Sequence, residues 1–358
     1  MEVANQQLTS TGQENAPAPD AYVALIRRRR LILSGLTLLL CLSFLLDIAN
    51  GPAGLGVAQA LDALFGNEGA SRAQSIIMWQ VRLPQALTAI LVGASLSLAG
   101  AEMQTILDNP LASPFTLGVS SAASLGAALA FILGVSLPGI PVGWLVPANA
   151  FLFAFGSVML LQVMASRRGA APDTLVLLGI AMVFAFNALV ALLQFVASES
   201  ALQQFVFWTM GNIAQTGWSK IAVLSIVLAI AIPWSFSVRW QLTALRFGTE
   251  RARSFGVSVV RLRFMTLLRI SLLAALSVAF VGTIGFVGLV GPHIARLLTG
   301  EDHRFFLPAS LLTGAVVMSL ASLASKMLIP GVLLPVGIVT SLVGIPVFIF
   351  LIMKRRAV

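Results

Sequence analysis

The sequence predicts an all-α polytopic membrane protein with about ten transmembrane helices and both termini in the cytoplasm. The chain has 358 residues, of which 58% are hydrophobic and 10% charged, and its mean hydropathy is +0.96. Apolar runs of about 20 residues, the length that a helix needs to cross a bilayer, recur along it. Basic residues gather in the short segments between these runs, as orientation in a membrane requires.

Composition and charge exclude several function classes. The net charge of +9 and pI near 11.3 would suit a nucleic-acid partner, but the basic residues lie between apolar runs. We therefore expect contact with membrane lipid and no nucleic acid. Cys41 is the single cysteine, so the chain has neither an intrachain disulfide nor a cysteine metal cluster. Two histidines, His293 and His303, cannot close a metal site by themselves, and we expect no metal.

The chain divides into a polar tail and one transmembrane domain. Residues 1–26 are predicted to be a disordered cytoplasmic tail, because their beginning is polar and lacks an apolar core. Arg27–Arg30 then fixes the start of the domain, 27–356, in the cytoplasm. Ten spans are predicted, at residues 31–49, 83–104, 115–136, 144–165, 174–197, 219–238, 265–283, 285–299, 306–328 and 334–353. The eighth of these is short and rich in glycine.

The distribution of basic residues tests this topology. Of the 22 basic residues, four fall on the predicted outer side: Arg72, Arg82, Lys220 and Lys326. The other 18 fall on the predicted inner side. A single miscounted span would reverse every later loop, so this bias supports both the span count and the orientation.

The stretch 82–130 organises the rest of the chain. It holds two apolar helices rich in Gly, Ala and Ser, which allow helix backbones to approach closely in lipid. Between them lies a polar break, 107–114, whose two prolines prevent either helix from continuing. Irregular backbone near membrane depth is tolerated where it is buried in protein or lines a wet cavity. The break is interpreted as an inner gate on a pathway wall, or equally as an ordinary tight turn between structural helices.

An outer loop is predicted at 50–80, with a weak amphipathic helix near 57–65 that could lie along the membrane surface. The longest inner loop, 239–264, is of a different kind. Together with Arg269 it holds seven basic residues against one acid, Glu250.

The inner loop has features of a docking element. A helical pattern over 249–255 is stopped by Gly256, and a further short helix is expected near Ser258. A basic loop of ordinary kind touches only lipid headgroups. Here the length, the glycine break and Phe255 beside charges favour a surface that a soluble partner grips.

Several polar groups lie inside the predicted spans. Glu102 is a carboxylate near the inner end of the second span, where it either bonds to the 108–114 turn or takes part in gating. Asn187 and Gln194 share one face of the fifth span and either line a path or hold helices together. His293 has no acid near it in the sequence, so catalysis by it is not expected.

Many short motifs occur in the order that one transporter family shows. They are Arg82-Leu-Pro, Val92-Gly-Ala, Ala99-Gly, Gln104, Asn109-Pro-Leu-Ala, Leu117-Gly-Val-Ser120, Phe207-Trp-Thr-Met-Gly211, Gly285-Phe-Val-Gly-Leu-Val-Gly-Pro-His293, Asp302-His-Arg304, Leu307-Pro308 and Pro335-Val-Gly-Ile338. Through these motifs, from about residue 80 to 353, the sequence resembles the permeases of ABC importers for ferric siderophores, haem and cobalamin.

The resemblance implies a ten-helix permease subunit of the inner membrane that pairs with a second copy or a paralogue. It also implies two ATPase subunits below it and a periplasmic or lipoprotein substrate-binding protein above it. The sequence contains no G-x-x-x-x-G-K-[ST] motif, so ATP and Mg are expected on the partner ATPase, with no cofactor and no enzymatic activity in this chain.

The resemblance also assigns roles to residues. The ATPase-coupling segment is expected at Thr249, Glu250, Arg251, Ala252, Ser254, Phe255, Gly256 and Val257. The cytoplasmic gate is expected at Asn109, Pro110, Leu111 and Asp173, and the binding-protein docking residues are Arg82, Gln85, Lys326 and Arg72. The candidates for lining the pathway are Asn187, Gln194, Ser120 and Ser121.

The sequence departs from the family pattern at several of these positions. Gln85 replaces an arginine, and Lys326 keeps a charge but lacks the bidentate fork of arginine. Ser322 stands where the family commonly carries an acid in the ninth span, and Leu334 replaces another acid. Asp173 stands where small hydroxyl residues narrow the exit.

Three functions compete. The first is the importer permease, with a ferric siderophore preferred to haem or cobalamin because it is the commonest cargo of the family. The second is an ion-coupled secondary transporter, which predicts midplane acids and inverted repeats. The third is an intramembrane enzyme, which needs a catalytic pair within the spans, and no such pair is evident in the sequence.

Overall fold

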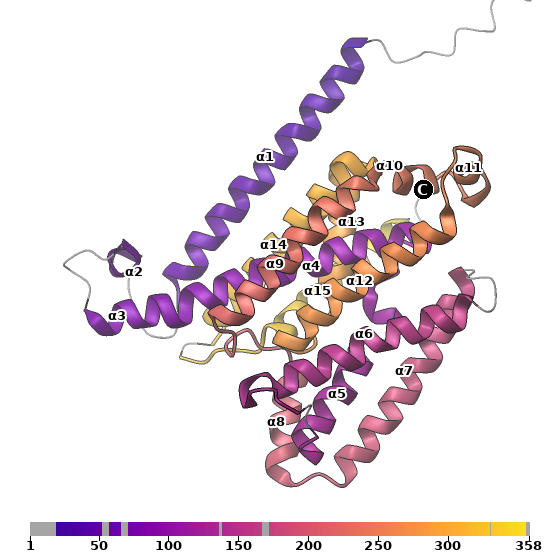
Figure 1. The fold of residues 1–358 in the computed structure, drawn as a ribbon. Coiled ribbons are helices and arrows are strands. Elements are labelled where there is room, and N and C mark those ends of the chain that lie inside the picture. The colour runs from indigo at the N-terminus through magenta and orange to yellow at the C-terminus, as the bar shows by residue number, and fades with distance from the viewer. Residues whose placement is uncertain are drawn as a thin grey trace, which may run out of the picture.

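The computed structural model describes residues 19–51, 57–65, 71–135, 138–166, 172–329 and 331–355, and every regular element in them is helical (Figure 1). The α-helices are α1 (Pro19–Ala49), α2 (Val57–Phe65), α3 (Arg72–Ile77), α4 (Leu83–Ile106), α5 (Val119–Leu133), α6 (Leu145–Ser166), α7 (Pro172–Phe195), α8 (Glu199–Thr209), α9 (Trp218–Ser237), α10 (Arg239–Leu245), α11 (Thr249–Ser254), α12 (Val259–Val281), α13 (Val287–Thr299), α14 (His303–Met327) and α15 (Val336–Arg355). Short 3-10 turns, Pro114–Leu117 and Val142–Trp144, precede α5 and α6.

The all-helical membrane fold class is confirmed. In the described residues, seven helices are long and apolar enough to cross a membrane: Ala21–Ala49, Arg72–Ile106, Val142–Met164, Thr174–Phe195, Trp218–Ser237, Val259–Val281 and His303–Met327. Val119–Leu133 and Val336–Ile349 are shorter apolar helices, and α13 has 13 residues. Each of the ten predicted spans therefore has a helix. Which side of the membrane each terminus faces stays a prediction.

Helix α4 lies at the centre of the packing. It contacts α14, α13 and α12, and 83% of its most apolar window is buried. At two points the backbone of α4 meets that of a neighbour directly: a Cβ on Gly100 would overlap the carbonyl oxygen of Gly288, and one on Gly93 that of Gly314. This backbone contact is the close approach that small residues permit in lipid.

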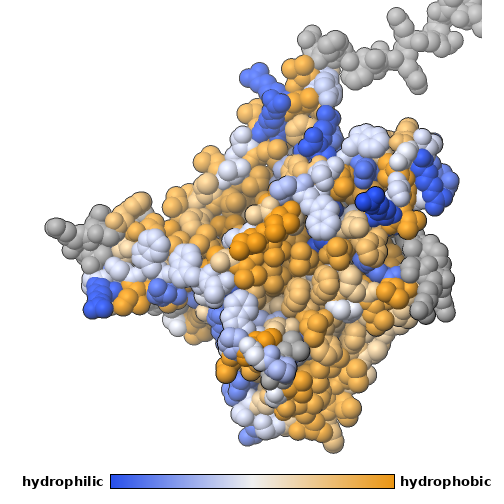
Figure 2. Space-filling model, viewed as in Figure 1, coloured by the Kyte–Doolittle hydropathy of each residue, from blue (hydrophilic) through white to orange (hydrophobic). Residues whose placement is uncertain are grey.

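A second group of helices, α5 to α8, packs beside α12 (Figure 1). Helices α5 and α6 make its most extensive contact, and α6 also packs on α12. The apolar surfaces of both groups face outward, and Figure 2 shows this orange covering over much of the molecule. Such a surface suits contact with lipid chains.

Helix α1 diverges from the body of the molecule, and only 17% of its apolar window is buried (Figure 1). It begins at Pro19, so residues 19–26, which were predicted to be disordered, are helical. Proline suits the first turn of a helix because the N–H that it lacks has no partner there. The rest of that predicted tail, residues 1–18, lies outside the described residues.

The outer loop 50–80 is shorter than predicted. The expected amphipathic helix is α2, but from Arg72 the chain is helical without interruption to Ile106. A five-residue π-helix, Met78–Arg82, joins α3 to α4. Sequence analysis missed this extension because a continuous helix outside the membrane need not be apolar.

The inner loop 239–264 is mostly helical. The helix expected near 249–255 is α11, whereas the short helix expected near Ser258 is the first turn of α12. Helix α10 and, between two spans, helix α8 were not predicted. Figure 1 shows α10, α11, the start of α1 and the C-terminus at one end of the molecule, as the charge pattern predicts. We call it the basic end.

Candidate functional site

The basic end is held together by Arg246, which lies between α10 and α11. Its guanidinium is bonded to Glu301, with Nε 3.1 Å from one carboxylate oxygen, and lies 3.2 Å from the carboxylate of Asp108. Asp108 directly follows α4, and its φ of +47° is unusual for a residue other than glycine. Arg246 thus connects the segment that precedes the predicted coupling residues to the turn that holds the predicted gate.

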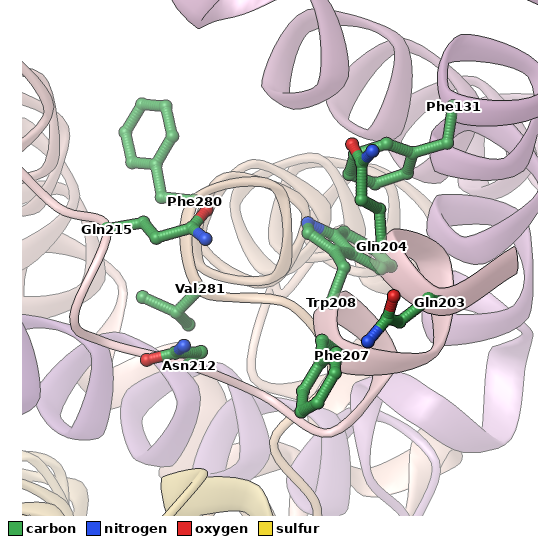
Figure 3. Close-up of a pocket in the computed structure, with 9 residues that line it drawn as sticks. All are labelled: Phe131, Gln203, Gln204, Phe207, Trp208, Asn212, Gln215, Phe280 and Val281. Atoms are coloured by element: carbon green, nitrogen blue, oxygen red, sulfur yellow. The ribbon is translucent and has the colours of Figure 1, made fainter. Parts of the chain in front are cut away.

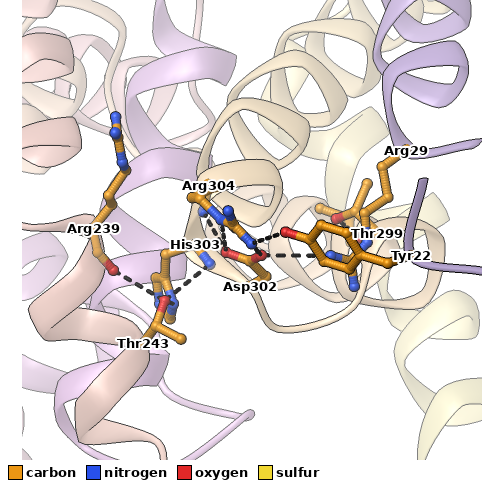
Figure 4. A network of polar contacts seen from close by, with 9 residues as sticks. Tyr22, Arg29, Arg239, Thr243, Thr299, Asp302, His303 and Arg304 are labelled. Carbon is orange, nitrogen blue, oxygen red and sulfur yellow. Dashed lines mark hydrogen bonds and ion pairs between the residues drawn. The ribbon is translucent and has the colours of Figure 1, made fainter. Parts of the chain in front are cut away.

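A second connection runs through His303, at the start of α14 (Figure 4). Its Nε2 lies 2.9 Å from the hydroxyl of Thr105 on α4, and its Nδ1 lies 3.1 Å from that of Thr243 on α10. The main-chain N–H of His303 also donates to Thr243. Because His303 is buried, these hydroxyls satisfy its ring nitrogens. Three helices therefore meet at one side chain.

Asp302, in the α13–α14 loop, adds an ion pair with α1 (Figure 4). Asp302 caps α14, and it accepts hydrogen bonds from Arg304 at 2.7 Å and from Arg29 at 3.5 Å. Burial raises the pKa of Asp302, but the hydrogen bonds of Arg304 and the charges of both arginines outweigh it and hold the pKa below its usual value. At Glu301 burial likewise raises the pKa, but the hydrogen bond and charge of Arg246, together with the charges of Arg296 and His303, outweigh it and hold the pKa below its usual value.

The predicted coupling segment presents a mixed surface. Ala252 and Val257 are buried and anchor α11. Thr249 accepts a hydrogen bond from Arg263 at 3.3 Å, whereas Arg251, Ser254, Phe255 and Gly256 are exposed, as is Glu250, which pairs with Arg253 at 2.9 Å. Phe247 and Phe255 are 59% and 55% exposed among these charges. Exposed aromatic rings beside arginines favour protein contact.

The predicted gate residues lie in a turn fixed by its own hydrogen bonds. The Asn109 side-chain oxygen accepts from the N–H of Leu111 at 2.9 Å, and Leu111 is 43% exposed. Pro110 lies between them and is half-buried. Asp173 is in the first turn of α7, and its side chain lies outside the described residues. No contact between Asp173 and the turn is described.

The four candidates for lining a pathway do not share one cavity. Ser120 lines an open cavity of about 470 Å³ between the start of α5, the segment after α8 and α15. Ser121 is half-buried beside it, and Asn187 and Gln194 lie on α7 with exposed and half-buried side chains. The structure therefore brings only Ser120 to this cavity.

Three of the four predicted docking residues are buried within this chain, and their role in docking stays a prediction. Arg82 is 3% exposed and donates to the carbonyl oxygens of Ile48 and Ala49 at 3.0 and 2.9 Å. Gln85 is buried too, and of these candidates only Arg72 is exposed. Burial of Arg82 against α1 allows its guanidinium to satisfy carbonyls that the end of α1 leaves free.

Lys326 is the fourth docking candidate, and it forms a buried ion pair within the chain. Its ammonium lies 2.8 Å from the carboxylate of Asp47 on α1, and Ser322 donates to the same carboxylate at 2.9 Å. The sequence analysis did not single out Asp47, although a carboxylate inside a predicted span indicates a buried partner of opposite charge. Where the resemblance implies an acid on the ninth span, this chain has Ser322 and obtains its carboxylate from α1.

Glu102 forms a second buried ion pair in place of the predicted bond to the 108–114 turn, and a part in gating stays a prediction. Arg269 of α12 donates to both carboxylate oxygens, with distances of 2.7–3.0 Å, and both side chains are fully buried. The guanidinium also lies over the Trp234 ring of α9, 5.1 Å from its centre. The pair joins α4, α9 and α12. The sequence did contain a sign of this pair, because Glu102 and Arg269 carry opposite charges at the inner ends of two predicted spans.

Comparison with known proteins gives the family. A family model described as the FecCD transport family matches residues 38–354. The molybdate import system permease MolB of Haemophilus influenzae is 34% identical over 94% of this chain and 98% of its own length. The vitamin B12 import system permease BtuC of Klebsiella pneumoniae is 34% identical over 92% of this chain and 96% of its own.

A solved structure gives the same result. It is described as an inward-facing metal-chelate type ABC transporter, with a TM-score of 0.80, 32% identity, and coverage of 91% of this chain and 99% of its own. The family model extends from the middle of α1 to α15, so it includes α10, α11 and both buried ion pairs. The chain therefore belongs to the FecCD transport family.

Proposed function

We propose that this chain is the permease subunit of an ATP-driven importer that carries a metal chelate, with a ferric siderophore as the favoured cargo. Haem and cobalamin are the alternative cargoes. The similarity to a metal-chelate type transporter and to a vitamin B12 permease supports a chelate. MolB is named for molybdate import, so molybdate is included in the test below.

One observation carries the mechanism: Arg246, in the short segment between α10 and α11, bonds both to the turn after α4 and to the α13–α14 loop. A partner that moves α11 would act through Arg246 on Asp108, and so on Asn109 and Leu111 next to it. Coupling of this kind needs a continuous physical connection between two sites, and ion pairs at close range provide one.

The partners follow from this mechanism. Two ATPase subunits grip α11, and a substrate-binding protein delivers cargo on the opposite side, where Arg72 is exposed. A second copy of this chain, or a paralogue, completes the path. The complex lies in the inner membrane with both termini of this chain in the cytoplasm, as its basic residues predict.

The test is uptake into proteoliposomes that contain this chain with the ATPase and binding protein of the same locus. Ferric siderophore, haem, cobalamin and molybdate are offered separately, with and without internal ATP. We expect ATP-dependent uptake of a chelate. Uptake without ATP, driven by an ion gradient, would instead support the secondary transporter, and ATP-dependent uptake of molybdate alone would reject a chelate cargo.

A further inference from the structure

A cavity of about 330 Å³ lies between α13, α14 and α15, three of the helices that stand where spans were predicted. Of the described residues that line it, Thr340 alone has a polar side chain. The Thr340 hydroxyl donates to the main-chain oxygen of Gly337 at 3.1 Å, within the same helix, so it already has a partner. The lining is therefore almost wholly hydrocarbon, and we call this the apolar cavity.

Two other cavities differ in that they carry polar side chains. The cavity of about 470 Å³ described above is lined by Ser120, Thr209 and Ser341, among others. A further cavity, of about 410 Å³, lies between α8 and the ends of α5 and α12, and four amide side chains of α8 and the segment after it line it (Figure 3). An ordered water needs roughly two to four polar partners, which both of these can provide. The apolar cavity offers none, so its occupant has to be apolar.

One wall of the apolar cavity is fixed by the main chain. Phe286, the residue before α13, has a φ of +66°, which is unusual for a large side chain. A Cβ on Gly344 of α15 would come within 2.5 Å of the Phe286 Cβ, so the phenylalanine lies directly against the backbone of α15. Strained backbone of this kind persists only where the surrounding structure holds it. The cavity is thus a fixed part of the fold.

The apolar cavity has an open side and a closed interior. Leu320 and Val343 line it and are 43% and 60% exposed, so it opens between α14 and α15. Val287, Val290 and Val339 also line it and are 1%, 6% and 3% exposed. The exposed surface of a membrane-spanning helix faces hydrocarbon chains, because the bilayer core holds no water.

The open side faces away from the proposed second copy of this chain. On α15, the cavity of about 470 Å³ is lined by Ile338, Ser341 and Ile345, and the apolar cavity by Thr340, Val343 and Val347. At about 3.6 residues per turn, these two sets lie on opposite faces of the helix. The larger cavity holds the pathway candidate Ser120, and a second copy completes the path on that side in the proposed function, on which this step rests. The opposite face of α15 is then left to lipid.

We propose that the apolar cavity binds the end of one acyl chain of a membrane phospholipid. A methylene group occupies roughly the volume of a water molecule in its liquid, about 30 Å³, so the 330 Å³ cavity holds on the order of ten carbon atoms. This fits the terminal part of one chain, while the headgroup stays outside. Without a chain, the side chains of the wall would lack partner atoms and lose their attraction. The bound chain supports α15 from the side opposite the cavity that holds Ser120.

Photolabelling by lipid tests this proposal. The full chain is placed in nanodiscs of phosphatidylcholine that carries a photoreactive diazirine near the end of one acyl chain, and labelled residues are identified by mass spectrometry. We expect label at Val290 and Val339, which are buried and which lipid reaches only through the cavity. Val336, also on α15 and 1% exposed, does not line the cavity and is the matched control that should stay unlabelled.

Filling the cavity should displace the chain. Ala321 lines the cavity on α14 and is 8% exposed, so Ala321→Phe places a ring in the free volume. We expect label at Val290 and Val339 to fall at least fivefold. Ala229→Phe, at an exposed position on α9, is the matched control and should leave the labelling unchanged.

The unfolding temperature gives an independent readout. Phospholipid returned to the delipidated chain in detergent should raise the unfolding temperature of the unmodified chain. Ala321→Phe should reduce that rise by at least half, because the ring already fills the cavity, whereas Ala229→Phe should show the full rise. An equal rise in both variants would overturn the proposal.

The labelling has its own contrary outcomes. Label confined to exposed residues such as Leu320 and Val343, or an Ala321→Phe variant labelled like its control, would overturn the proposal. Interior label that disappears when two copies associate would assign the cavity to the second copy and also overturn it. ATP-driven uptake is measured separately in proteoliposomes. Interior label without such uptake rejects the proposed importer and leaves the lipid site, whereas uptake without interior label rejects the lipid site alone.

Discussion

At the scale of single residues, two ion pairs buried among the apolar helices are the least expected feature of this chain. Each unites helices that are far apart in the sequence, Glu102 with Arg269 and Asp47 with Lys326. A buried charge whose partner is removed is strongly destabilising, whereas replacement of the whole pair by apolar residues is often neutral. The two pairs therefore allow sharp tests of stability.

Glu102→Gln would leave Arg269 charged and fully buried. We expect a loss of about 3–5 kcal/mol in the free energy of unfolding, measured by thermal or denaturant unfolding in detergent. The double replacement Glu102→Leu with Arg269→Met should recover most of this loss. A double variant as unstable as Glu102→Gln would contradict the account.

Asp47→Asn should destabilise by a similar mechanism, because Lys326 loses its carboxylate. Adding Ser322→Asp returns a carboxylate within the same cluster, since the Ser322 hydroxyl donates to the Asp47 carboxylate at 2.9 Å. We expect the second change to restore at least half of the lost thermal stability. If Ser322→Asp lowers stability further, the two positions are not equivalent sources of the carboxylate.

The carboxylates of the basic end predict a dependence on pH. Glu301 and Asp302 have pKa values below their usual ones, so they stabilise the fold above the unfolded-state pKa near 4. This contribution is lost as the pH falls through the lower folded-state values. The unfolding temperature should therefore drop below about pH 4.5, and Glu301→Gln should flatten that drop. If the unfolding temperature of Glu301→Gln depends on pH as steeply as that of the unmodified chain, Glu301 does not contribute as described.

At this scale, prediction from sequence was limited because the sequence does not show which helices pack against one another. The sequence analysis placed Lys326 correctly in a span helix but expected its charge at a surface, because nothing in the chain shows that α1 packs against α14. The same holds for Glu102, whose partner lies 167 residues away. Composition reveals that a charge is inside an apolar run, but only the packing reveals what neutralises it.

At the scale of elements, hydropathy predicted the long helices well, since a bilayer demands apolar runs of set length. Helices α8 and α10 were not predicted, because they are too short to span a membrane and are stabilised by packing against neighbouring helices. In the coupling segment, α11 and its stop at Gly256 were predicted from local pattern alone. Gly256 has a φ of +82°, which favours glycine.

Gly256→Val tests the α11–α12 junction. Nothing lies within 4 Å of a Cβ at this position, so the substitution strains only the backbone. We expect ATP-driven uptake to fall at least fivefold while binding-protein docking is retained. Gly139→Val is the matched control, with the same φ of +82° and an equally open surrounding, but in the α5–α6 connection. Equal loss of uptake and docking in Gly256→Val would contradict a coupling role.

At the scale of the whole molecule, the basic end and the cavity of Figure 3 lie at opposite ends of α12. Transport requires that events at these ends be linked, and Arg246 is the described residue that bonds both α4's turn and the α13–α14 loop. Family membership predicted these parts in outline. It did not predict Arg246, Glu301 or Thr243, because their role depends on how three loops meet.

Arg246→Gln removes the charge that joins Asp108 to Glu301. We expect it to reduce ATP-driven uptake about tenfold while the ATPase still binds, measured by co-purification, since coupling terms are commonly 1–3 kcal/mol. Arg239→Gln, which removes an exposed charge from α10 at the same end of the molecule, is the control and should change uptake little. If the control loses as much uptake, general loss of charge explains the effect.

The buried ion pairs also bear on how the protein is made. Asp47 enters the membrane with α1, but its partner Lys326 is synthesised 279 residues later. At translation rates of about 5–20 residues per second, this carboxylate waits roughly 15–55 s for its counter-charge. A lone charge at the centre of a spanning helix costs about 2.5–3.5 kcal/mol, and a smaller cost applies to Asp47 near the end of α1. We therefore expect α1 to remain beside the insertion machinery, with the Asp47 carboxyl protonated or hydrated, until α14 emerges. The first helix would then be released into lipid only when the chain is nearly complete.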